Sequence, residues 1–366
     1  MANVAESVSL FTRLPHPAPV AAEVREAVLA NPGFGTAFTD HMVTIEWTEG
    51  QGWHGATLGP RGPLSLDPAA AVLHYAQEIF EGMKAYRSGD GGITLFRPEA
   101  NAARLNASAR RMAMPEIPEA LFLAAIRELV LADRAWIPDG DGASLYLRPF
   151  MIATEPFLGV RPAKQYKFVV IASPAGNYFK SGAPAVSLWV SDYTRAAPGG
   201  TGAAKCGGNY AASLVPTAEA FAKGHDQVLF LDAAEHKWVE ELGGMNLFFA
   251  FADGSILTPP LSGTILPGIT RDSLLTLARE EGLTVREEPY SLDQWRADAA
   301  SGQLVEVFAC GTAAVVTPVG KVSNHDGSFT IGSGGPGQLT GKLKARLVAI
   351  QRGEEADSHG WVTHLA

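Results

Sequence analysis

Lys205 opens a glycine-rich hexapeptide, Lys-Cys-Gly-Gly-Asn-Tyr, that could hold a reactive amine in a tight turn. The segment 186–190 before it reads as a strand, and the segment 209–223 after it has the periodicity of a helix. A lysine in such a connection can form a Schiff base with a carbonyl compound. Since lysines are nearly always solvated, an isolated lysine here would more simply be a surface residue. The hypothesis of a nucleophilic amine therefore depends on the neighbours of Lys205 in the fold.

Two adjacent carboxylates, Glu240 and Glu241, are the second candidates for chemistry. They leave one strand-like stretch and precede an apolar one that begins near Leu247. Successive side chains of a strand point to opposite faces, so only one of the two carboxylates can face a site. Periodicity does not choose between them.

Two further features favour the binding of an anion. The segment 266–271, Leu-Pro-Gly-Ile-Thr-Arg, has the form of a helix start, where free backbone N–H groups and the helix dipole attract a phosphate and Thr270 adds a hydroxyl. Arg104 and Ser108 lie four residues apart on one face of a predicted helix, and an arginine fork suits a phosphate. Each feature also has a plain reading, because every helix has an N-terminus and Arg104 could belong to a solvated face.

The composition indicates a globular protein that acts on small molecules. The chain has 366 residues, 46% of them apolar and 18% charged, and this length suggests two domains. A net charge of −9 without a block of Lys or Arg argues against a nucleic-acid surface. Cys206 and Cys310 lie far apart and without metal-binding spacing, so neither a disulfide framework nor a metal site is expected. With no signal-like start and no long apolar run, we expect a cytoplasmic protein that spans no membrane.

The chain divides into four predicted parts. Residues 1–40 read as an N-terminal arm without an assigned function, 41–173 as a small domain with an α+β pattern, 174–185 as a turn-rich linker, and 186–366 as a larger domain. The predicted helices cover residues 69–80, 98–111, 119–133, 209–223, 270–282 and 339–351. The predicted strands cover residues 42–47, 83–86, 93–96, 145–154, 167–173, 186–192, 227–232, 238–241, 247–251 and 304–309.

Eight motifs, in order along nearly the whole chain, make the sequence resemble the branched-chain amino-acid aminotransferases of the fold-type IV pyridoxal-phosphate enzymes. The motifs are the segments 77–86, 97–104, 146–149, 154–156, 205–210, 240–246, 266–271 and 311–313. The resemblance implies a small α/β domain and a larger domain with a β-barrel-like sheet and flanking helices. It also implies a homodimer, because half of each site in this family commonly comes from the neighbouring subunit.

The resemblance implies pyridoxal 5′-phosphate as the cofactor. Lys205 would bind it covalently and then carry protons. Glu241, rather than Glu240, precedes Leu-Gly as the family's ring-nitrogen carboxylate does. The remaining contacts, to the phosphate and near the ring oxygen, would come from Arg104, Ile269, Thr270 and Tyr210.

The resemblance also implies a substrate pocket. The α-carboxylate would meet the backbone amides of Thr312 and Ala313, and Arg148 would bind the γ-carboxylate of glutamate. Because an apolar pocket separates alkyl chains by only about 1–3 kcal/mol per methylene, leucine, isoleucine and valine are all expected to bind. The aromatic wall of this pocket would be formed by Tyr75, Phe80, Tyr146 and Tyr178.

The implied reaction moves the amino group of L-leucine, L-isoleucine or L-valine to 2-oxoglutarate, giving branched-chain 2-oxo acids and L-glutamate. One alternative keeps the cofactor and changes the reaction, as in a D-amino-acid aminotransferase or an aminodeoxychorismate lyase. Such relatives generally lack segments like 81–87 and 154–156. A second alternative is a non-catalytic binding protein that has retained the fold, since a fold does not prove an activity.

Overall fold

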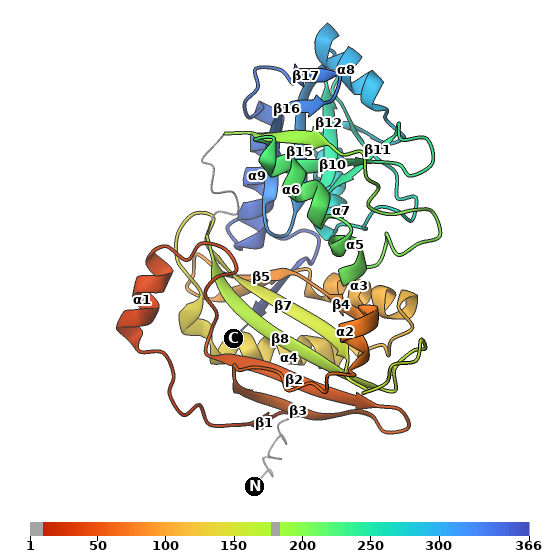
Figure 1. Ribbon diagram of the computed structural model, residues 1–366. Helices are drawn as coiled ribbons and strands as arrows, with labels where there is room; N and C mark the ends of the chain where they lie inside the picture. The colour runs from red at the N-terminus through yellow and green to blue at the C-terminus, as the bar shows by residue number, and fades with distance from the viewer. Residues whose placement is uncertain (1–9, 177–183, 366) are drawn as a thin grey trace.

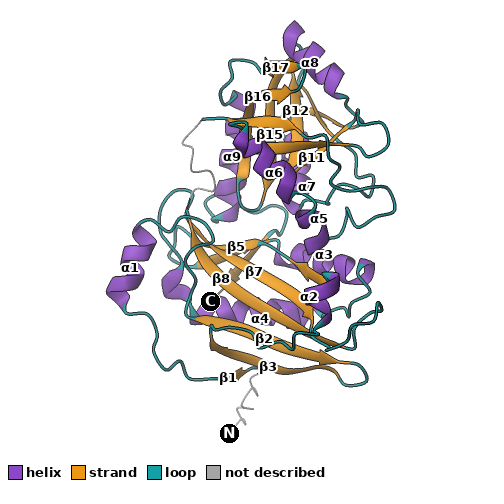
Figure 2. Cartoon of the chain, viewed as in Figure 1, coloured by secondary structure: helices purple, strands orange, loops and turns teal. Residues whose placement is uncertain are grey.

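The computed structural model describes residues 10–176 and 184–365 of the chain. Within these residues the chain forms two lobes, and each lobe is built around one nine-stranded sheet (Figure 1). Figure 2 shows the strands grouped into these two sheets, with helices around them and loops at the junction of the lobes. The mixed α and β architecture predicted from the sequence is confirmed.

The first sheet is largely antiparallel. Its strand order is β1-β3-β2-β8-β7-β5-β6-β18, and β4 pairs with β7 beside this path. The exception is β1, which runs parallel to β3. The strands of this sheet are β1 (Thr12–Arg13), β2 (His41–Thr48), β3 (Gly52–Pro60), β4 (Glu78–Phe80), β5 (Met83–Arg87), β6 (Ile93–Phe96), β7 (Ser144–Ala153), β8 (Gln165–Ala175) and β18 (Val362–Leu365).

The helices of the first lobe pack onto this sheet through apolar faces. Phe122, Ile126 and Leu129 of α4 are fully buried, and the Phe122 ring lies 5.9 Å from that of Phe168 on β8. Pro98 occupies the start of α3, where its missing N–H costs no helical hydrogen bond. The helices are α1 (Ala22–Ala30), α2 (Ala71–Tyr75), α3 (Pro98–Arg111) and α4 (Glu119–Ala132), followed by a 3₁₀ turn, Arg134–Trp136.

The second sheet is mixed, with strand order β11-β10-β9-β16-β15-β12-β13-β14 and with β17 paired to β16. Its strands are β9 (Val186–Val190), β10 (Gln227–Leu231), β11 (Val239–Leu242), β12 (Asn246–Phe251), β13 (Ser255–Thr258), β14 (Thr284–Glu287), β15 (Leu304–Gly311), β16 (Val315–Asn324) and β17 (Gly327–Thr330). The helices of this lobe are α5 (Gly207–Ala211), α6 (Leu214–Ala222), α7 (Ile269–Glu280), α8 (Leu292–Ser301) and α9 (Gln338–Gln351).

Strand β12 separates two apolar cores. Phe249 packs against Trp295 of α8 with ring centroids 4.8 Å apart, whereas Phe248 stacks on Phe308 at 5.1 Å in the core covered by α7 and α9. Successive strand residues point to opposite faces, so an uninterrupted apolar run fills both cores. Among the described helices, none has the length and apolar character that crossing a bilayer requires.

Two predicted helices are shorter than expected. The helix predicted over 69–80 ends at Tyr75, because Ala76 adopts a left-handed conformation (φ 48°) and the chain then enters β4. The helix predicted over 209–223 is divided into α5 and α6. Pro216 lacks a backbone N–H, so it is tolerated only in the first turn of a helix, and α6 restarts at Leu214 to accommodate it.

The ends of the chain depart from the predicted division into parts. Strand β18 pairs with β6 of the first sheet, although residues 186–366 were predicted to form one domain. Within the predicted arm, residues 10–40 contribute β1 and α1 and pack against the first lobe. Local pattern could not show either result, because both depend on pairing with segments far away in the sequence.

Candidate active site

A cavity lies where the two lobes meet. Both lobes contribute residues to its wall, and these residues lie at strand ends, in turns and at helix starts. The predicted residues that line it are Phe80, Arg104, Tyr146, Arg148, Lys205, Tyr210, Glu241, Ile269, Thr270, Thr312 and Ala313. Lining residues that were not singled out from the sequence include Phe34, Met245, Asn246, Leu266, Gly268 and Cys310.

Lys205 is fixed by its backbone to the first lobe while it belongs to the second. Its N–H donates to the Ser108 hydroxyl at 2.9 Å, and its carbonyl accepts from the Phe80 N–H at 3.0 Å. The Lys205 Nζ donates to the Tyr210 hydroxyl at 2.9 Å and lies 5.0 Å from the centroid of the Phe80 ring. The helix that follows, α5, begins two residues later at Gly207. The predicted amine therefore reaches the cavity with Tyr210 as its polar partner.

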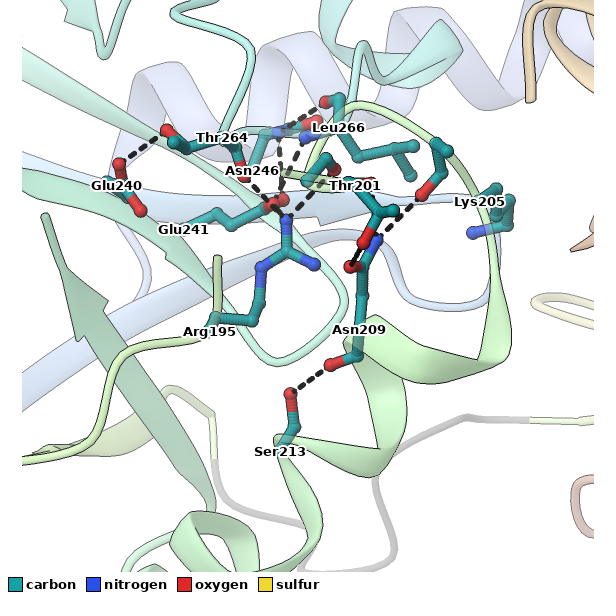
Figure 3. A network of polar contacts seen from close by, with 12 residues as sticks. Arg195, Thr201, Lys205, Asn209, Ser213, Glu240, Glu241, Asn246, Thr264 and Leu266 are labelled. Atoms are coloured by element: carbon teal, nitrogen blue, oxygen red, sulfur yellow. Dashed lines mark hydrogen bonds and ion pairs between the residues drawn. The ribbon is translucent and has the colours of Figure 1, made fainter. Parts of the chain in front are cut away.

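The strand β11 separates the two adjacent carboxylates, as its pleat requires. Glu241 lines the cavity, whereas Glu240 points to the other side and accepts from the Thr264 hydroxyl (Figure 3). Burial raises the pKa of both carboxyls, that of Glu241 to about 7 against the opposing charge of Arg195. The choice that periodicity left open is thus made by the fold, which turns Glu241 toward the cavity.

Arg195 is a buried partner of Glu241 that the sequence did not reveal. Its guanidinium forms an ion pair with the Glu241 carboxylate, and both side chains are 4% exposed. The Leu266 N–H also donates to this carboxylate at 3.1 Å. Figure 3 shows the Arg195 side chain pointing toward the Glu241 carboxylate. Nothing in the local pattern around Arg195 distinguishes it from a surface arginine, so no sequence signal could have found it.

Arg104 lines the cavity, but its guanidinium is already paired with Glu81, an acid that was not predicted at the site. The guanidinium donates from Nε and Nη2 to the two Glu81 oxygens at 2.8 and 2.7 Å, and from Nη1 to the Pro267 carbonyl at 3.0 Å. Burial is the largest single effect and would raise the pKa of Glu81, but the charge and hydrogen bonds of Arg104, the charge of Lys205 and the Asn101 hydrogen bond together hold that pKa below its usual value. Three of the five arginine N–H donors are thereby used, and two are left for an anion.

The start of α7 presents the predicted anion site to the cavity. Ile269 and Thr270 form the first residues of this helix, and Gly268 is its N-cap. A Cβ atom on Gly268 would lie 2.0 Å from the Asn246 Oδ1, so any other residue at this position would displace the Asn246 side chain. The Asn246 amide in turn donates to the Leu266 carbonyl at 3.1 Å, which holds the loop before the helix in place.

Thr312 and Ala313 lie in the turn between β15 and β16 and line the cavity. Lys84, part of a quoted motif but not predicted at the site, donates from Nζ to the Ala313 carbonyl at 2.9 Å. Burial lowers the pKa of Lys84 to about 8, and the charge of Lys344 adds to this effect. A buried cation thus braces the turn from behind.

An aromatic and cationic wall completes the cavity. The Arg148 guanidinium lies 4.7 Å from the centroid of the Phe80 ring and donates to the Tyr146 hydroxyl at 3.1 Å. The Arg148 Nε is buried and has no hydrogen-bond partner among the described residues. Phe34, from the predicted arm, packs edge-on against Tyr146 with centroids 5.1 Å apart. The arm therefore contributes to the site, which the sequence did not indicate.

One predicted substrate residue, Tyr75, is not brought to the cavity. Tyr75 is 38% exposed at the end of α2, and its hydroxyl donates to the Leu158 carbonyl on the surface of the first lobe. It does not line this chain's cavity. Tyr178 lies outside the described residues.

The cavity combines a primary amine, a buried carboxylate, a helix start and an arginine side chain. An amine and a carboxylate at one cavity suit a cofactor that has a carbonyl group and a basic ring. The start of α7 suits its anionic group. The Arg148 guanidinium and the turn at Thr312 suit the carboxylates of an amino-acid substrate.

Comparisons with known proteins agree with this arrangement. The sequence profile of the family described as amino-transferase class IV matches residues 78–322. A branched-chain-amino-acid aminotransferase of Mycolicibacterium smegmatis is 58% identical over 360 residues, which cover 97% of this chain and 98% of the relative. A probable branched-chain-amino-acid aminotransferase of Streptomyces coelicolor is 59% identical over 350 residues, covering 95% and 96%.

Solved structures of similar fold carry related names. The branched-chain amino acid aminotransferase of Escherichia coli superimposes with a TM-score of 0.74 at 30% identity, covering 88% of this chain and 99% of that one. A T.th. branched-chain amino acid aminotransferase, complexed with N-(5′-phosphopyridoxyl)-L-glutamate, gives a TM-score of 0.72 at 30% identity, covering 88% and 98%. These neighbours confirm the predicted fold-type IV architecture with its curled second sheet. The chain belongs to the class IV amino-transferase family and, within it, groups with the branched-chain-amino-acid aminotransferases.

Proposed function

We propose that this protein transfers the amino group of L-leucine, L-isoleucine or L-valine to 2-oxoglutarate with bound pyridoxal 5′-phosphate. The observation that carries the proposal is the Lys205 amine at a cavity that Glu241 and the start of α7 also line. The relatives' names support the branched-chain substrates, and the phosphopyridoxyl compound bound in the T.th. enzyme supports the cofactor.

The residues of the cavity fit this cofactor. Lys205 supplies the amine for covalent attachment, with Tyr210 beside it. Glu241 supplies a carboxylate for the ring nitrogen, and Thr270 with the first amides of α7 supplies donors for the phosphate. When bound, the cofactor withdraws electrons from the substrate's α-carbon.

The chain's own groups then move one proton and exclude water. The Lys205 amine would take the α-proton of the substrate and return it, with the Tyr210 hydroxyl as its hydrogen-bond partner. Glu241 would hold a proton on the ring nitrogen, because a buried carboxylate next to a cationic ring favours the charged pair. Phe80 packs over both Lys205 and Tyr210 and keeps this side of the cavity apolar.

The same pocket has to accept an alkyl chain and a second carboxylate. The apolar faces of Phe80 and Tyr146 suit the alkyl chain. The Arg148 guanidinium, which lines the cavity, suits the γ-carboxylate of glutamate. The backbone amides of Thr312 and Ala313 would bind the α-carboxylate common to both substrates.

The proposal includes a homodimer in which each subunit completes its neighbour's pocket. Tyr75 is exposed near other large apolar side chains of the first lobe, and such a patch is typical of an interaction surface. We therefore assign Tyr75 to the pocket of the neighbouring subunit. The exposed apolar residues on these segments are Leu73, Phe157, Leu158 and Val160. A cytoplasmic location is also proposed, and the two buried free thiols, Cys206 and Cys310, are compatible with a reducing compartment.

The decisive experiment uses the purified protein loaded with pyridoxal phosphate. Each amino acid is added without an acceptor, and the visible absorbance of the bound cofactor is followed. L-Leucine, L-isoleucine, L-valine and L-glutamate should each bleach it, whereas D-alanine should not. Lys205→Ala serves as the control, since it should keep the phosphate contacts at α7 and yet fail to react.

Three outcomes would count against the proposal. Bleaching by D-alanine in place of the L-amino acids would indicate the D-amino-acid enzyme. Release of pyruvate from aminodeoxychorismate without an acceptor would indicate the lyase. A protein that binds no cofactor at all would indicate the non-catalytic alternative. Borohydride reduction followed by peptide mapping should find the label on the peptide that contains Lys205.

A further inference from the structure

Arg195 lies in the loop between β9 and α5, and the proposed reaction does not use it. Its side chain is 4% exposed and contributes one nitrogen, Nη2, to three acceptors. These acceptors are the Glu241 carboxylate, the Thr264 carbonyl at 2.8 Å and the Gly202 carbonyl at 3.3 Å. Burying a guanidinium is costly, so its retention next to Glu241 calls for an explanation.

The donors around Glu241 divide unequally between its two oxygens. Oε1 accepts from Arg195 and from the Leu266 N–H at 3.1 Å. Among the described residues, Oε2 has only the Asn246 amide, at the long distance of 3.4 Å. Oε1 is therefore fully engaged with the protein, and Oε2 is the oxygen left for a ligand in the cavity.

We propose that Arg195 is a positioning residue, which keeps Glu241 ionised and directs its Oε2 at the ring nitrogen of the cofactor. This inference rests on the proposed function. Glu241 alone would be a poor partner for a cationic ring, because burial already raises its pKa to about 7 even with Arg195 opposing that effect. Removing the guanidinium would take away the largest effect that opposes desolvation at this carboxyl and would favour its neutral form.

A purely structural role is the competing explanation. Arg195 also bridges the Gly202 and Thr264 carbonyls, so it could simply fasten two loops. The Arg195 Nε, however, is buried and has no hydrogen-bond partner among the described residues. The side chain is therefore not oriented so that it donates to the largest number of acceptors. Its orientation is better explained by the carboxylate than by the loops. The two explanations predict different effects of an Arg195 substitution on the binding of ligands with and without a ring nitrogen.

The test compares two ligands of the apoprotein that differ in one atom. The first is pyridoxal phosphate, and the second is its carbocyclic analogue, in which a C–H group replaces the ring nitrogen. The wild type, Arg195→Gln and Arg195→Lys are titrated with each, and the dissociation constants are measured by calorimetry. Arg195→Gln should bind pyridoxal phosphate at least about tenfold more weakly and change analogue binding less than about twofold. Arg195→Lys, which keeps the charge, should recover most of the affinity.

A double-mutant cycle provides the second readout. In a Glu241→Gln background, Arg195→Gln should cause no further loss of pyridoxal phosphate affinity, because both changes act on one interaction. Equal losses for both ligands, or fully additive losses in the cycle, would show that Arg195 only fastens the loops. If Arg195→Gln folds poorly, Arg195→Met takes its place and the ratio of the two affinities decides in the same way. Failure of the wild type to bind either ligand would instead refute the proposed function and this inference with it.

Discussion

Glu240 and Glu241 are neighbours in sequence with opposite surroundings. Glu241 lines the cavity and pairs with Arg195. Glu240 points away, and its Oε2 is buried without a hydrogen-bond partner among the described residues. Glu241 is therefore expected to affect activity, and Glu240 is expected to affect stability. Substitutions of these two neighbours can be compared directly.

The glutamine variants of this pair should separate activity from stability. Glu241→Gln removes the charge that would hold the ring nitrogen, so turnover with leucine should fall at least about a hundredfold, as when one electrostatic contact in an active site is lost. Glu240→Gln should keep turnover within about threefold of wild type. Steady-state rates with saturating pyridoxal phosphate provide the measurement. Comparable losses in both variants would mean that the facing of the two side chains has been assigned wrongly.

Glu240 should also shape the pH dependence of stability. Burial raises the pKa of this carboxyl, so the folded protein prefers the protonated form. The stability that this preference contributes is present below the ordinary carboxyl pKa and is lost as the pH rises through the raised value. Since glutamine is neutral at every pH, Glu240→Gln should show a smaller fall in Tm between pH 5 and pH 8 than wild type. Parallel Tm curves for the two proteins would contradict this.

At the scale of the element, the start of α7 shows how tightly the site is packed. Gly268 is the N-cap of this helix, and the Asn246 side chain occupies the space where a Cβ would lie. Asn246 in turn reaches the Leu266 carbonyl and the Glu241 carboxylate. The helix start and the carboxylate are thus coupled through one amide.

Gly268→Ala should disturb both partners of that amide. The added Cβ would lie 2.0 Å from the Asn246 Oδ1, and overpacking of this kind costs about 1–3 kcal/mol. We expect lower stability in urea and weaker binding of pyridoxal phosphate. Gly341→Ala is the control, because it lies within α9 with nothing near the added Cβ and should leave the protein unchanged or slightly more stable. Wild-type cofactor affinity in Gly268→Ala would show that Asn246 has room to move.

At the scale of the whole molecule, the site draws on distant parts of the chain. Phe34 comes from the predicted arm, and the last strand, β18, returns to the first sheet. Tyr75 remains exposed on the surface of the first lobe. The proposed dimer accounts for this tyrosine by placing it at the pocket of the neighbouring subunit.

Mixing two defective variants tests that placement. Tyr75→Ala should lose most of its activity as a homodimer, and Lys205→Ala should be inactive. After dissociation and random reassociation in equal amounts, half of the dimers are hybrids, and each hybrid has one site with both residues. Activity should then recover to roughly a quarter of wild type. No recovery on mixing would mean that Tyr75 acts in its own subunit or not at all.

The sequence by itself determined much of the local structure and the identity of the motifs. Helix α3 begins at Pro98 as predicted. Most of the predicted site residues, among them Arg104 and Ala313, line the cavity. Caps, turns and glycine-rich segments depend on interactions between residues that are close in the sequence, so they can be predicted from the sequence alone. For the same reason the motif at Lys205 could be recognised without coordinates.

The tertiary structure decided which side chains face one another. It turned Glu241, which the motif had indicated and periodicity had not, toward the cavity, paired Arg104 with Glu81, and brought Arg195 next to Glu241. It also removed Tyr75 from this chain's pocket. Buried ion pairs and sheet pairings join residues with no fixed spacing in sequence, and their energies depend on desolvation, which only the packed fold creates.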